Sequence, residues 1–299
     1  MASMSTITWG RMRTFLAVAD HGSVRAAAGA LFVTEPAVSA AISHMERSLG
    51  TDLLAREGRG VRLTDSGRIY ADYCRTILGL IAEASAAVQS SERGLLRISS
   101  VETAGECVLP RLLGSFRERF PDVEVSLSVL PRDELFEALS HHETDLAVAG
   151  RPPAGQGLAT HAIRANRLVM VGAPGRSVDP MTTTWLLRGP GSGTRVTALG
   201  LLAQLDATPP TLTLGTHGAV AAAAREGLGI TLVHADAVQH DLERGALVEL
   251  RIPHTPMNRP WHVVTTGAPT RTTQLFLDHI TDADRVGAAA FHLDNRPAG

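Results

Sequence analysis

Residues 22–63 constrain the fold of this chain most, because they predict two short helices separated by a tight turn. Ser23 can accept an orphan backbone N–H at the start of the first helix, and Thr34 can do the same for the second. Pro36 is tolerated just after Thr34, since the first helical turn needs no N–H donor at that position. The stretch therefore predicts a helix-turn-helix.

Both predicted helices have a face suited to packing. Small Ala26, Ala27 and Ala28 allow the helices to cross closely, and Leu31-Phe32-Val33 is expected to plug the turn. The second helix has one apolar face, with spacings of 4, 3 and 4, made of Val38, Ile42, Met45 and Leu49. Its opposite face carries only small or polar residues, namely Pro36, Ser39, Ala40, Ser43 and Arg47. Such a helix can lie in the major groove of DNA.

Two short extended runs follow, at 53–56 and 61–63, joined by Glu57-Gly58-Arg59-Gly60. They predict a β-hairpin wing with Arg59 at its tip, where an arginine can enter a minor groove. The alternative interpretation of the whole stretch is a short amphipathic helical hairpin without a DNA role.

A long helix is predicted from Asp65 to about residue 92, capped by Thr64 and ended by Gly94. Apolar residues recur along it at 4, 3, 4 and 3, namely Tyr73, Ile77, Leu80, Ala84 and Ala87. A period of 3.5 residues lets two helices form a seam. The alternative is an ordinary surface helix packed on its own domain.

From residue 95 onward, strands alternate with helices, which predicts α/β layers with ligands at the carboxyl ends of the strands. Strands are expected at 95–100, 123–129, 145–149, 167–171, 185–188, 211–214, 230–233, 247–252 and 261–265. Helices are expected at 109–120, 133–140, 194–205, 219–226, 236–243 and 271–283. Residues 287–299 are expected to form a frayed tail.

The pattern from Phe15 to Gly67 resembles the DNA-binding domain of the LysR-type transcriptional regulators. It includes Ala26-Ala27-Ala28, Pro36-Ala37-Val38-Ser39, Leu49-Gly50, Arg56, Arg59 and Leu63-Thr64-x-x-Gly67. The resemblance implies an α/β chain with three parts: a winged helix-turn-helix over 1–64, a dimerising linker helix over 65–93, and an effector domain over 94–299. The effector domain would have two lobes built like a periplasmic binding protein. Lobe one would span about 95–165 and 267–299, and lobe two about 166–266, with crossovers near Ile163 and Thr265.

The DNA-contacting candidates follow from this resemblance and the exposed face of the second helix. They are Ser23, Thr34, Glu35, Pro36, Ser39, Ser43, Arg47 and Arg59. Two departures from the family pattern predict a different base preference: Glu35 stands before Pro36, and Ala40-Ala41 follow Ser39. A glutamate can accept from cytosine N4 but repels phosphate.

Effector candidates follow predicted strands. One loop opens a predicted helix, Gly189-Pro190-Gly191-Ser192-Gly193-Thr194-Arg195. Its glycine N–H groups, its hydroxyls and Arg195 could hold an anion. The alternative is a tight structural turn. The loop is neither a Walker A loop nor a dinucleotide fingerprint. Ser99, Ser100 and Thr103 would face it from lobe one, as the resemblance implies. The remaining candidates are Arg132, Arg151, Thr216 and His217. The alternative for the two arginines is a plain surface charge, and the alternative for His217 is a helix cap.

Several segments resemble the regulators of Calvin-cycle (RuBisCO) operons, whose effectors are phosphorylated sugars, related acids or NADPH. They are Gly150-Arg151-Pro152-Pro153, Pro190 to Arg195, Gly227-Leu228-Gly229-Ile230 and Trp261-His262-Val263-Val264. Thr216-His217-Gly218 departs from the polar Ser-Asn-Glu often found there. We carry over the class of effector, a small anionic metabolite, and not its identity.

Composition excludes several other classes. The chain of 299 residues has 44% hydrophobic residues, a net charge of −2, no run of about 18 apolar residues and no signal-peptide plan at its start. With Cys74 and Cys107 alone, a disulfide framework is not expected, and a cytoplasmic location fits. There is no GxSxG, HExxH or CxxC, so we expect no catalytic residues, no metal ligands and no cofactor. The prediction is a homodimeric or homotetrameric DNA-binding regulator. Its rivals are a solute-binding protein and a ligand-independent regulator with a vestigial cleft.

Overall fold

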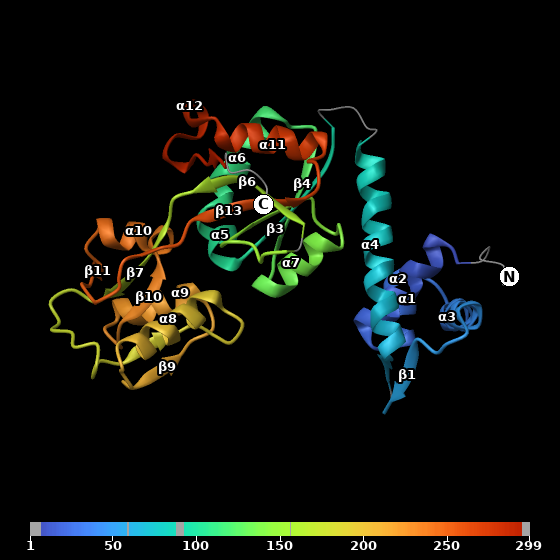
Figure 1. Cartoon of the computed structure of the whole chain (residues 1–299), viewed down its shortest axis with the longest axis horizontal. Helices are drawn as coiled ribbons and strands as arrows, with labels where there is room; N and C mark the ends of the chain where they lie inside the picture. Colours follow the sequence, from blue (N-terminus) through green and yellow to red (C-terminus); the bar gives the residue numbers. More distant parts are fainter. Residues whose placement is uncertain (1–6, 59, 88–92, 156, 295–299) are drawn as a thin grey trace. The chain divides into compact units, whose positions relative to one another are not determined.

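The computed structural model describes residues 7–58, 60–87, 93–155 and 157–294. Two compact units make up the chain, Met1–Val88 with Ser140–Thr144, and Gln89–Leu139 with Asp145–Gly299. The first unit is mainly helical, and the second is a mixed α/β structure (Figure 1).

The first unit contains the predicted helix-turn-helix. Helices α1 (Trp9–His21), α2 (Val24–Leu31) and α3 (Glu35–Leu49) surround an apolar core. The Ser23 and Thr34 hydroxyls each accept a backbone N–H at 3.4 Å, so both predicted caps are confirmed. Ala27, Ala28, Val38, Ile42 and Met45, from the faces predicted to pack, form this core together with Phe15 and Val18 of α1, and all seven are fully or nearly fully buried.

The predicted apolar plug of the turn is wrong. Phe32 is 96% exposed, and its backbone adopts the left-handed conformation that ends α2. That conformation turns the side chain to solvent, while Ala27 and Ala28 fill the space between the helices. Ala26 and Leu49 were expected on the packing faces, but neither belongs to the core. Ala26 is exposed, and Leu49, at the end of α3, is 36% exposed.

The wing forms as predicted. Strands β1 (Leu54–Glu57) and β2 (Gly60–Leu63) pair antiparallel, with Leu54 opposite Leu63. The Val61 N–H donates to the Gly22 carbonyl at 2.9 Å and attaches the wing to the α1–α2 loop. A Cβ at Gly60 would lie 2.7 Å from that carbonyl oxygen, so this close approach needs glycine. Arg59, at the predicted tip, lies outside the described residues.

Helix α4 (Asp65–Ala87) follows, and Thr64 caps it by accepting the Gly67 N–H at 2.9 Å. Its predicted seam is exposed to solvent within the unit, because Tyr73, Ile77 and Leu80 are 66%, 39% and 45% exposed. Gly94 does not end this helix as predicted but begins strand β3. No single helix in the described part of the chain is long and apolar enough to cross a membrane, although α2 and α3, bent by 110°, reach that length and composition as a pair.

Lobe one of the second unit is built on a six-stranded sheet of order β14-β6-β13-β5-β3-β4. Strands β3 (Gly94–Ser100), β4 (Val123–Val129) and β5 (Leu146–Ala149) run parallel, and β13 (Trp261–Thr266), β6 (Leu158–Arg164) and β14 (His292–Leu293) extend it antiparallel. Its helices are α5 (Glu102–Cys107), α6 (Leu109–Arg119), α7 (Arg132–Ser140), α11 (Arg271–Thr281) and α12 (Ala283–Val286).

The buried strand β5 shows why both faces of this sheet are covered. Leu146 and Val148 pack with α6 and α11 on one face, whereas Ala147 and Ala149 pack with α7 on the other (Figure 1). Successive side chains of a strand point to opposite faces, so a continuous apolar strand needs a layer on each side.

Lobe two is built around β7 (Arg167–Gly172). Strands β10 (Thr231–His234), β11 (Val248–Glu249) and β12 (Met257–Asn258) pair with it antiparallel, and β8 (Trp185–Leu187) pairs in parallel with β9 (Thr211–Thr213). Helices α8 (Gly193–Gln204), α9 (His217–Arg225) and α10 (Ala235–Glu243) cover these strands.

Two predicted boundaries change. Strand β13 pairs with β5 and β6, so residues 261–266 belong to lobe one and the chain returns from lobe two after Asn258, before the predicted Thr265. The predicted frayed tail is also wrong for its described part, 287–294, because Phe291 is fully buried and β14 pairs with β6. Strands β6, β12 and β14 and helices α5 and α12 were not predicted.

Candidate effector site and DNA-contacting surface

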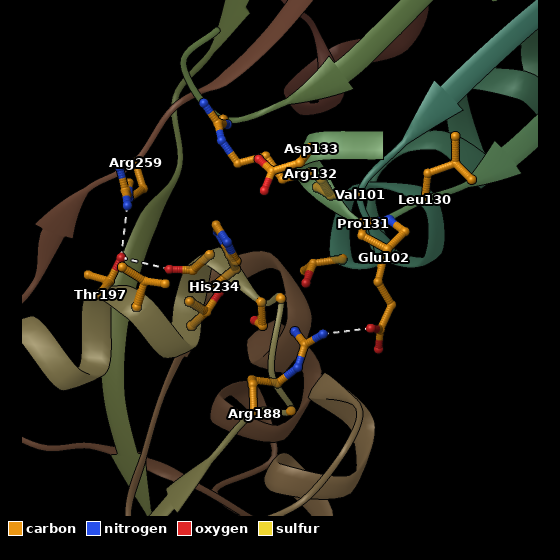
Figure 2. Close-up of a pocket in the computed structure, with 18 of the residues that line it drawn as sticks. Val101, Glu102, Leu130, Pro131, Arg132, Asp133, Arg188, Thr197, His234 and Arg259 are labelled. Carbon is orange, nitrogen blue, oxygen red and sulfur yellow. Dashed lines mark hydrogen bonds and ion pairs between the residues drawn. The ribbon is translucent and has the colours of Figure 1, made fainter. Parts of the chain in front are cut away.

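A cavity of about 690 Å³ lies between the two lobes of the second unit. From lobe one it is lined by residues that follow β3, β4 and β5: 101–103, 129–133 and 150–151. From lobe two it is lined by 188–194, after β8, and by the first turn of α8 (Figure 2). The lining therefore comes mainly from the carboxyl ends of strands, where open α/β sheets bind ligands.

Four arginines line the cavity, Arg132, Arg151, Arg188 and Arg259, against the two acids Glu102 and Asp133. Of these four arginines, only Arg188 forms an ion pair with a carboxylate of the described residues. It donates to Glu102 Oε2 at 2.6 Å. Arg259 donates to the Thr197 hydroxyl at 2.8 Å (Figure 2). The lining carries an excess of positive charge.

Arg132 begins α7, and the surrounding residues hold its side chain in place. Its Nη2 donates to the Arg151 carbonyl at 2.5 Å, and its guanidinium lies 4.8 Å from the ring centre of Phe136. Burial, together with the nearby charge of Arg259, lowers the pKa of Arg132, yet an arginine stays protonated at neutral pH. Arg132 and Arg151 were both predicted, and both reach the cavity.

The first turn of α8 faces the cavity through Ser192, Gly193 and Thr194, as predicted. Ser192 caps the helix by accepting the Arg195 N–H at 3.5 Å. The first N–H groups of a helix have no intrahelical partner and carry the positive end of its dipole, which favours an anion.

Arg195 does not line the cavity, although the sequence predicted it as the anion clamp. Its Nη1 donates to the Arg188 carbonyl at 2.8 Å and to the Thr213 hydroxyl at 3.2 Å. Arg195 therefore braces the loop that presents Arg188. Arg188 itself was not predicted as a site residue.

Three further predicted residues do not line the cavity: Ser99 and Ser100 at the end of β3, and Thr216 after β9. Ser99 and Ser100 are buried, and Ser100 Oγ packs against Gly105 of α5, where a Cβ would lie 2.6 Å from it. Thr216 caps α9 by accepting the Ala219 N–H at 3.1 Å. Of the hydroxyls predicted in lobe one, Thr103 alone lines the cavity.

His217 also lies outside the lining, in a contact between the lobes. Its backbone N–H and its Nδ1 both lie 3.1 Å from Glu102 Oε1. Its Nε2 lies 3.4 Å from Glu106 Oε2 and 3.7 Å from Cys107 Sγ. Burial and nearby carboxylates raise the pKa of Cys107 to about 11.

His234 and Trp261 line the cavity and were not predicted as site residues. Their rings stack with centres 4.4 Å apart, and His234 Nδ1 lies 2.5 Å from the Asn166 amide nitrogen. Burial lowers the pKa of His234 to about 3, so the ring is neutral near pH 7. It therefore contributes a polar surface without charge.

The predicted DNA-contacting residues lie in the first unit. Glu35, Pro36, Ser39, Ser43 and Arg47 are all exposed on α3, and Arg47 Nε donates to the Ser43 carbonyl at 3.1 Å. Residues 39, 43 and 47 share one face because they are four apart. The hydroxyls of Ser23 and Thr34 each accept a helix N–H, which leaves the O–H and one lone pair of each for other partners.

Two family profiles match the chain. The profile described as "Bacterial regulatory helix-turn-helix protein, lysR family" matches residues 9–68, and that described as "LysR substrate binding domain" matches residues 89–285. The chain belongs to the LysR family. It is a transcriptional regulator with a helix-turn-helix and an effector-binding domain, which confirms the predicted resemblance and fold class.

Relatives agree with this assignment. The regulator is 33% identical to the "HTH-type transcriptional regulator CbbR" of Rhodospirillum rubrum, over 85% of this chain and 88% of that protein. It is 30% identical to the "RuBisCO operon transcriptional regulator" of Acidithiobacillus ferrooxidans, over 88% and 89%. A full-length OxyR variant from Pseudomonas aeruginosa shares the fold, with a TM-score of 0.71, 17% identity and coverage of 98% of this chain and 99% of that one.

Proposed function

We propose that this regulator binds promoter DNA as a homodimer or homotetramer and responds to a small anionic metabolite held between its two lobes. The observation that carries the proposal is the convergence of four arginines and the start of α8 on one cavity with two acids. An anion there gains charge-assisted hydrogen bonds and a favourable helix dipole. The name of the relative from Acidithiobacillus, a RuBisCO operon transcriptional regulator, supports the RuBisCO-operon subgroup, and phosphorylated sugars and related acids belong to this effector class.

The anion would act by contacting both lobes at once. Arg132 and Arg151 belong to lobe one, Arg188 belongs to lobe two, and Arg259 follows the last strand of lobe two. A ligand shifts a conformational equilibrium only when it binds one state better than the other. A more closed arrangement of the lobes brings these guanidinium groups around the same anion and is therefore the state that it favours.

The first unit supplies the output. An exposed polar face on α3 is suited to base edges in a major groove, and the exposed seam of α4 is suited to a second copy of the chain. Because promoter DNA is the target, we place the protein in the cytoplasm, acting as a regulator and not as an enzyme.

Thermal unfolding with a panel of anions tests the effector proposal. The panel contains sugar bisphosphates, phosphoenolpyruvate, NADPH, dicarboxylates and aromatic acids. A ligand at 100 times its Kd stabilises a protein by about 2.7 kcal/mol, which raises Tm by roughly 5–10 °C in a domain of this size.

The variant Arg132→Gln removes one guanidinium of the cavity, and Arg271→Gln, at an exposed position outside it, is the matched control. A charge-assisted hydrogen bond contributes about 1.5–3 kcal/mol, so binding of the active anion should weaken roughly 10- to 150-fold in the first variant only. If no anion raises Tm, or if the active anion raises Tm equally in both variants, the effector proposal fails and the cleft is vestigial.

The DNA-binding role is tested by footprinting on the operator. Replacing exposed Ser39 with arginine places a large cation in the centre of the α3 face without disturbing the buried face. We expect specific protection to be lost while the melting of the protein is unchanged. Unaltered protection would remove α3 from the DNA interface.

A further inference from the structure

We propose that His234 contacts the bound anion directly, as an uncharged hydrogen-bond donor that selects an oxygen atom with a free lone pair. The residue ends β10 in lobe two and lines the cavity near Arg188 and Arg259 (Figure 2). The proposal rests on the proposed function, because it assigns one more ligand contact in the same cavity. The arginines of the lining attract negative charge, whereas a neutral donor discriminates by hydrogen-bonding character.

The hydrogen bonds of Asn166 determine which ring nitrogen of His234 carries the proton. Asn166 Nδ2 lies 3.1 Å from the Arg259 carbonyl oxygen, which can only accept, so the atom at this position must be the amide nitrogen. The same nitrogen lies 2.5 Å from His234 Nδ1. Because an amide nitrogen only donates, Nδ1 accepts and the ring proton lies on Nε2. A doubly protonated ring would set one N–H against another at this contact.

Asn166 is itself fixed where the chain crosses between the lobes. It follows β6, is 8% exposed, and its backbone carbonyl accepts the Arg259 N–H at 2.8 Å. Arg259 follows β12, at the second crossover. The two crossovers therefore hold the Asn166 amide in one orientation, and that orientation sets the tautomer of His234.

The face of the His234 ring is held by Trp261. The two rings stack with centres 4.4 Å apart and an angle of 25° between their planes. Trp261 is 1% exposed, and its Nε1 donates to Asp236 Oδ2 at 2.7 Å. The Asp236 carboxylate also accepts two nitrogens of Arg164, at 2.8 and 3.0 Å. With its edge and its face both held, the His234 ring is preorganised and loses little freedom when an anion binds.

His234 Nε2 is available to a ligand. Within the part of the chain that the structure describes, the ring bonds to Asn166 through Nδ1, and Nε2 has no partner and stays accessible. Burial, with the nearby charges of Arg259 and Arg188, lowers the pKa of His234 to about 3, which independently supports a neutral ring. The group facing Nε2 must therefore be an acceptor. A phosphate, carboxylate, carbonyl or hydroxyl oxygen fits, whereas an ammonium group does not.

NMR of ¹⁵N-labelled histidine rings in the full-length protein tests the tautomer without any ligand. Protonated and bare ring nitrogens have well-separated ¹⁵N shifts, and the signals of His234 are those that disappear in His234→Phe. We expect a bare Nδ1 and a protonated Nε2 between about pH 5 and pH 8, because the pKa lies near 3. A proton on Nδ1 at neutral pH, in a neutral or a charged ring, would overturn the proposal.

Two substitutions separate hydrogen bonding from packing. His234→Phe keeps a ring to stack on Trp261 but has no nitrogen, whereas His234→Gln loses the ring and offers an amide that can accept from Asn166 and donate to an anion. The assay is calorimetric titration with the sugar bisphosphate, phosphoenolpyruvate or other anion of the panel that raises Tm most.

We expect the Kd of that anion to be about 10- to 150-fold weaker in His234→Phe, the range for a hydrogen bond to a charged acceptor, and less weakened in His234→Gln. The control His240→Phe, at an exposed position on α10, should bind as the wild type does. The opposite order, with phenylalanine tolerated and glutamine not, would reduce His234 to a packing role and overturn the proposal.

The outcomes also separate this proposal from the function on which it rests. If no anion of the panel raises Tm, the effector function fails and the role of His234 fails with it. If an anion raises Tm and binds more weakly to Arg132→Gln, but binds His234→Phe as tightly as the wild type, the effector function stands and the role of His234 alone is refuted.

Discussion

The exposed seam of α4 makes a quantitative prediction about dimerisation. Leu80 lies on the same face as Tyr73 and Ile77, and 45% of it is exposed. If a second copy of the chain covers this face, Leu80→Arg removes apolar contact from both copies and places two cations at the seam. The matched control is Ala82→Arg, because Ala82 is also exposed but lies about 200° around the helix from Leu80.

The magnitude follows from the exposed fraction. Complete burial of a leucine side chain is worth about 1.5–3 kcal/mol, so covering the remaining 45% of Leu80 is worth about 0.7–1.4 kcal/mol in each chain. Two chains lose about 1.4–2.7 kcal/mol, which corresponds to a dimer Kd roughly 10- to 100-fold weaker before any charge repulsion is added.

Sedimentation velocity over a concentration series measures this Kd directly. We expect Leu80→Arg to dissociate at concentrations where the wild type and Ala82→Arg stay dimeric, and to bind an operator with two half-sites less tightly for the same reason. A Kd for Leu80→Arg within about threefold of wild type would refute the seam, as would an equal loss in both variants.

Three further outcomes are expected from single contacts. Gly67→Ala puts a Cβ 2.0 Å from a backbone carbonyl oxygen and should destabilise the first unit by about 1–3 kcal/mol in thermal unfolding. The control Gly29→Ala has open space around the new Cβ and should not destabilise the unit. Equal stability of the two variants would contradict the packing argument. Asp145, whose side chain is 5% exposed, accepts the Arg97 guanidinium at 2.6 Å, so Asp145→Asn should cost about 3–5 kcal/mol in urea unfolding, and a loss below 1 kcal/mol would show that the charge is not needed. The folded pKa of His234, about 3, lies below its ordinary value of 6.5, so the unfolded chain takes up the proton first as the pH falls. The free energy of unfolding should therefore decrease as the pH is lowered from about 6.5 toward 3. If His234→Gln shows the same pH profile, that loss of stability comes from other groups.

Local features of the fold were predictable because their signals come from close neighbours in sequence. Ser23, Thr34 and Pro36 mark helix starts through bonds within one turn, and the alternation of strands and helices depends on short-range periodicity. Errors arose where packing decided direction. Phe32 turns outward because a left-handed cap ends α2, and the buried Phe291 belongs to a segment that was expected to be a frayed tail.

The sequence by itself determined the family, the helix-turn-helix with its wing, the apolar stripe along the long helix and the positive loops that follow strands. Only the tertiary structure decided which of those loops meet. Arg132 and Arg151 reach the cavity, whereas Arg195 turns back to brace Arg188, because the direction of a long side chain depends on the nearest acceptor. The contact of His217 with α5 likewise joins residues 110 positions apart across two lobes. No short-range pattern encodes such a contact, since it exists only after both crossovers have formed.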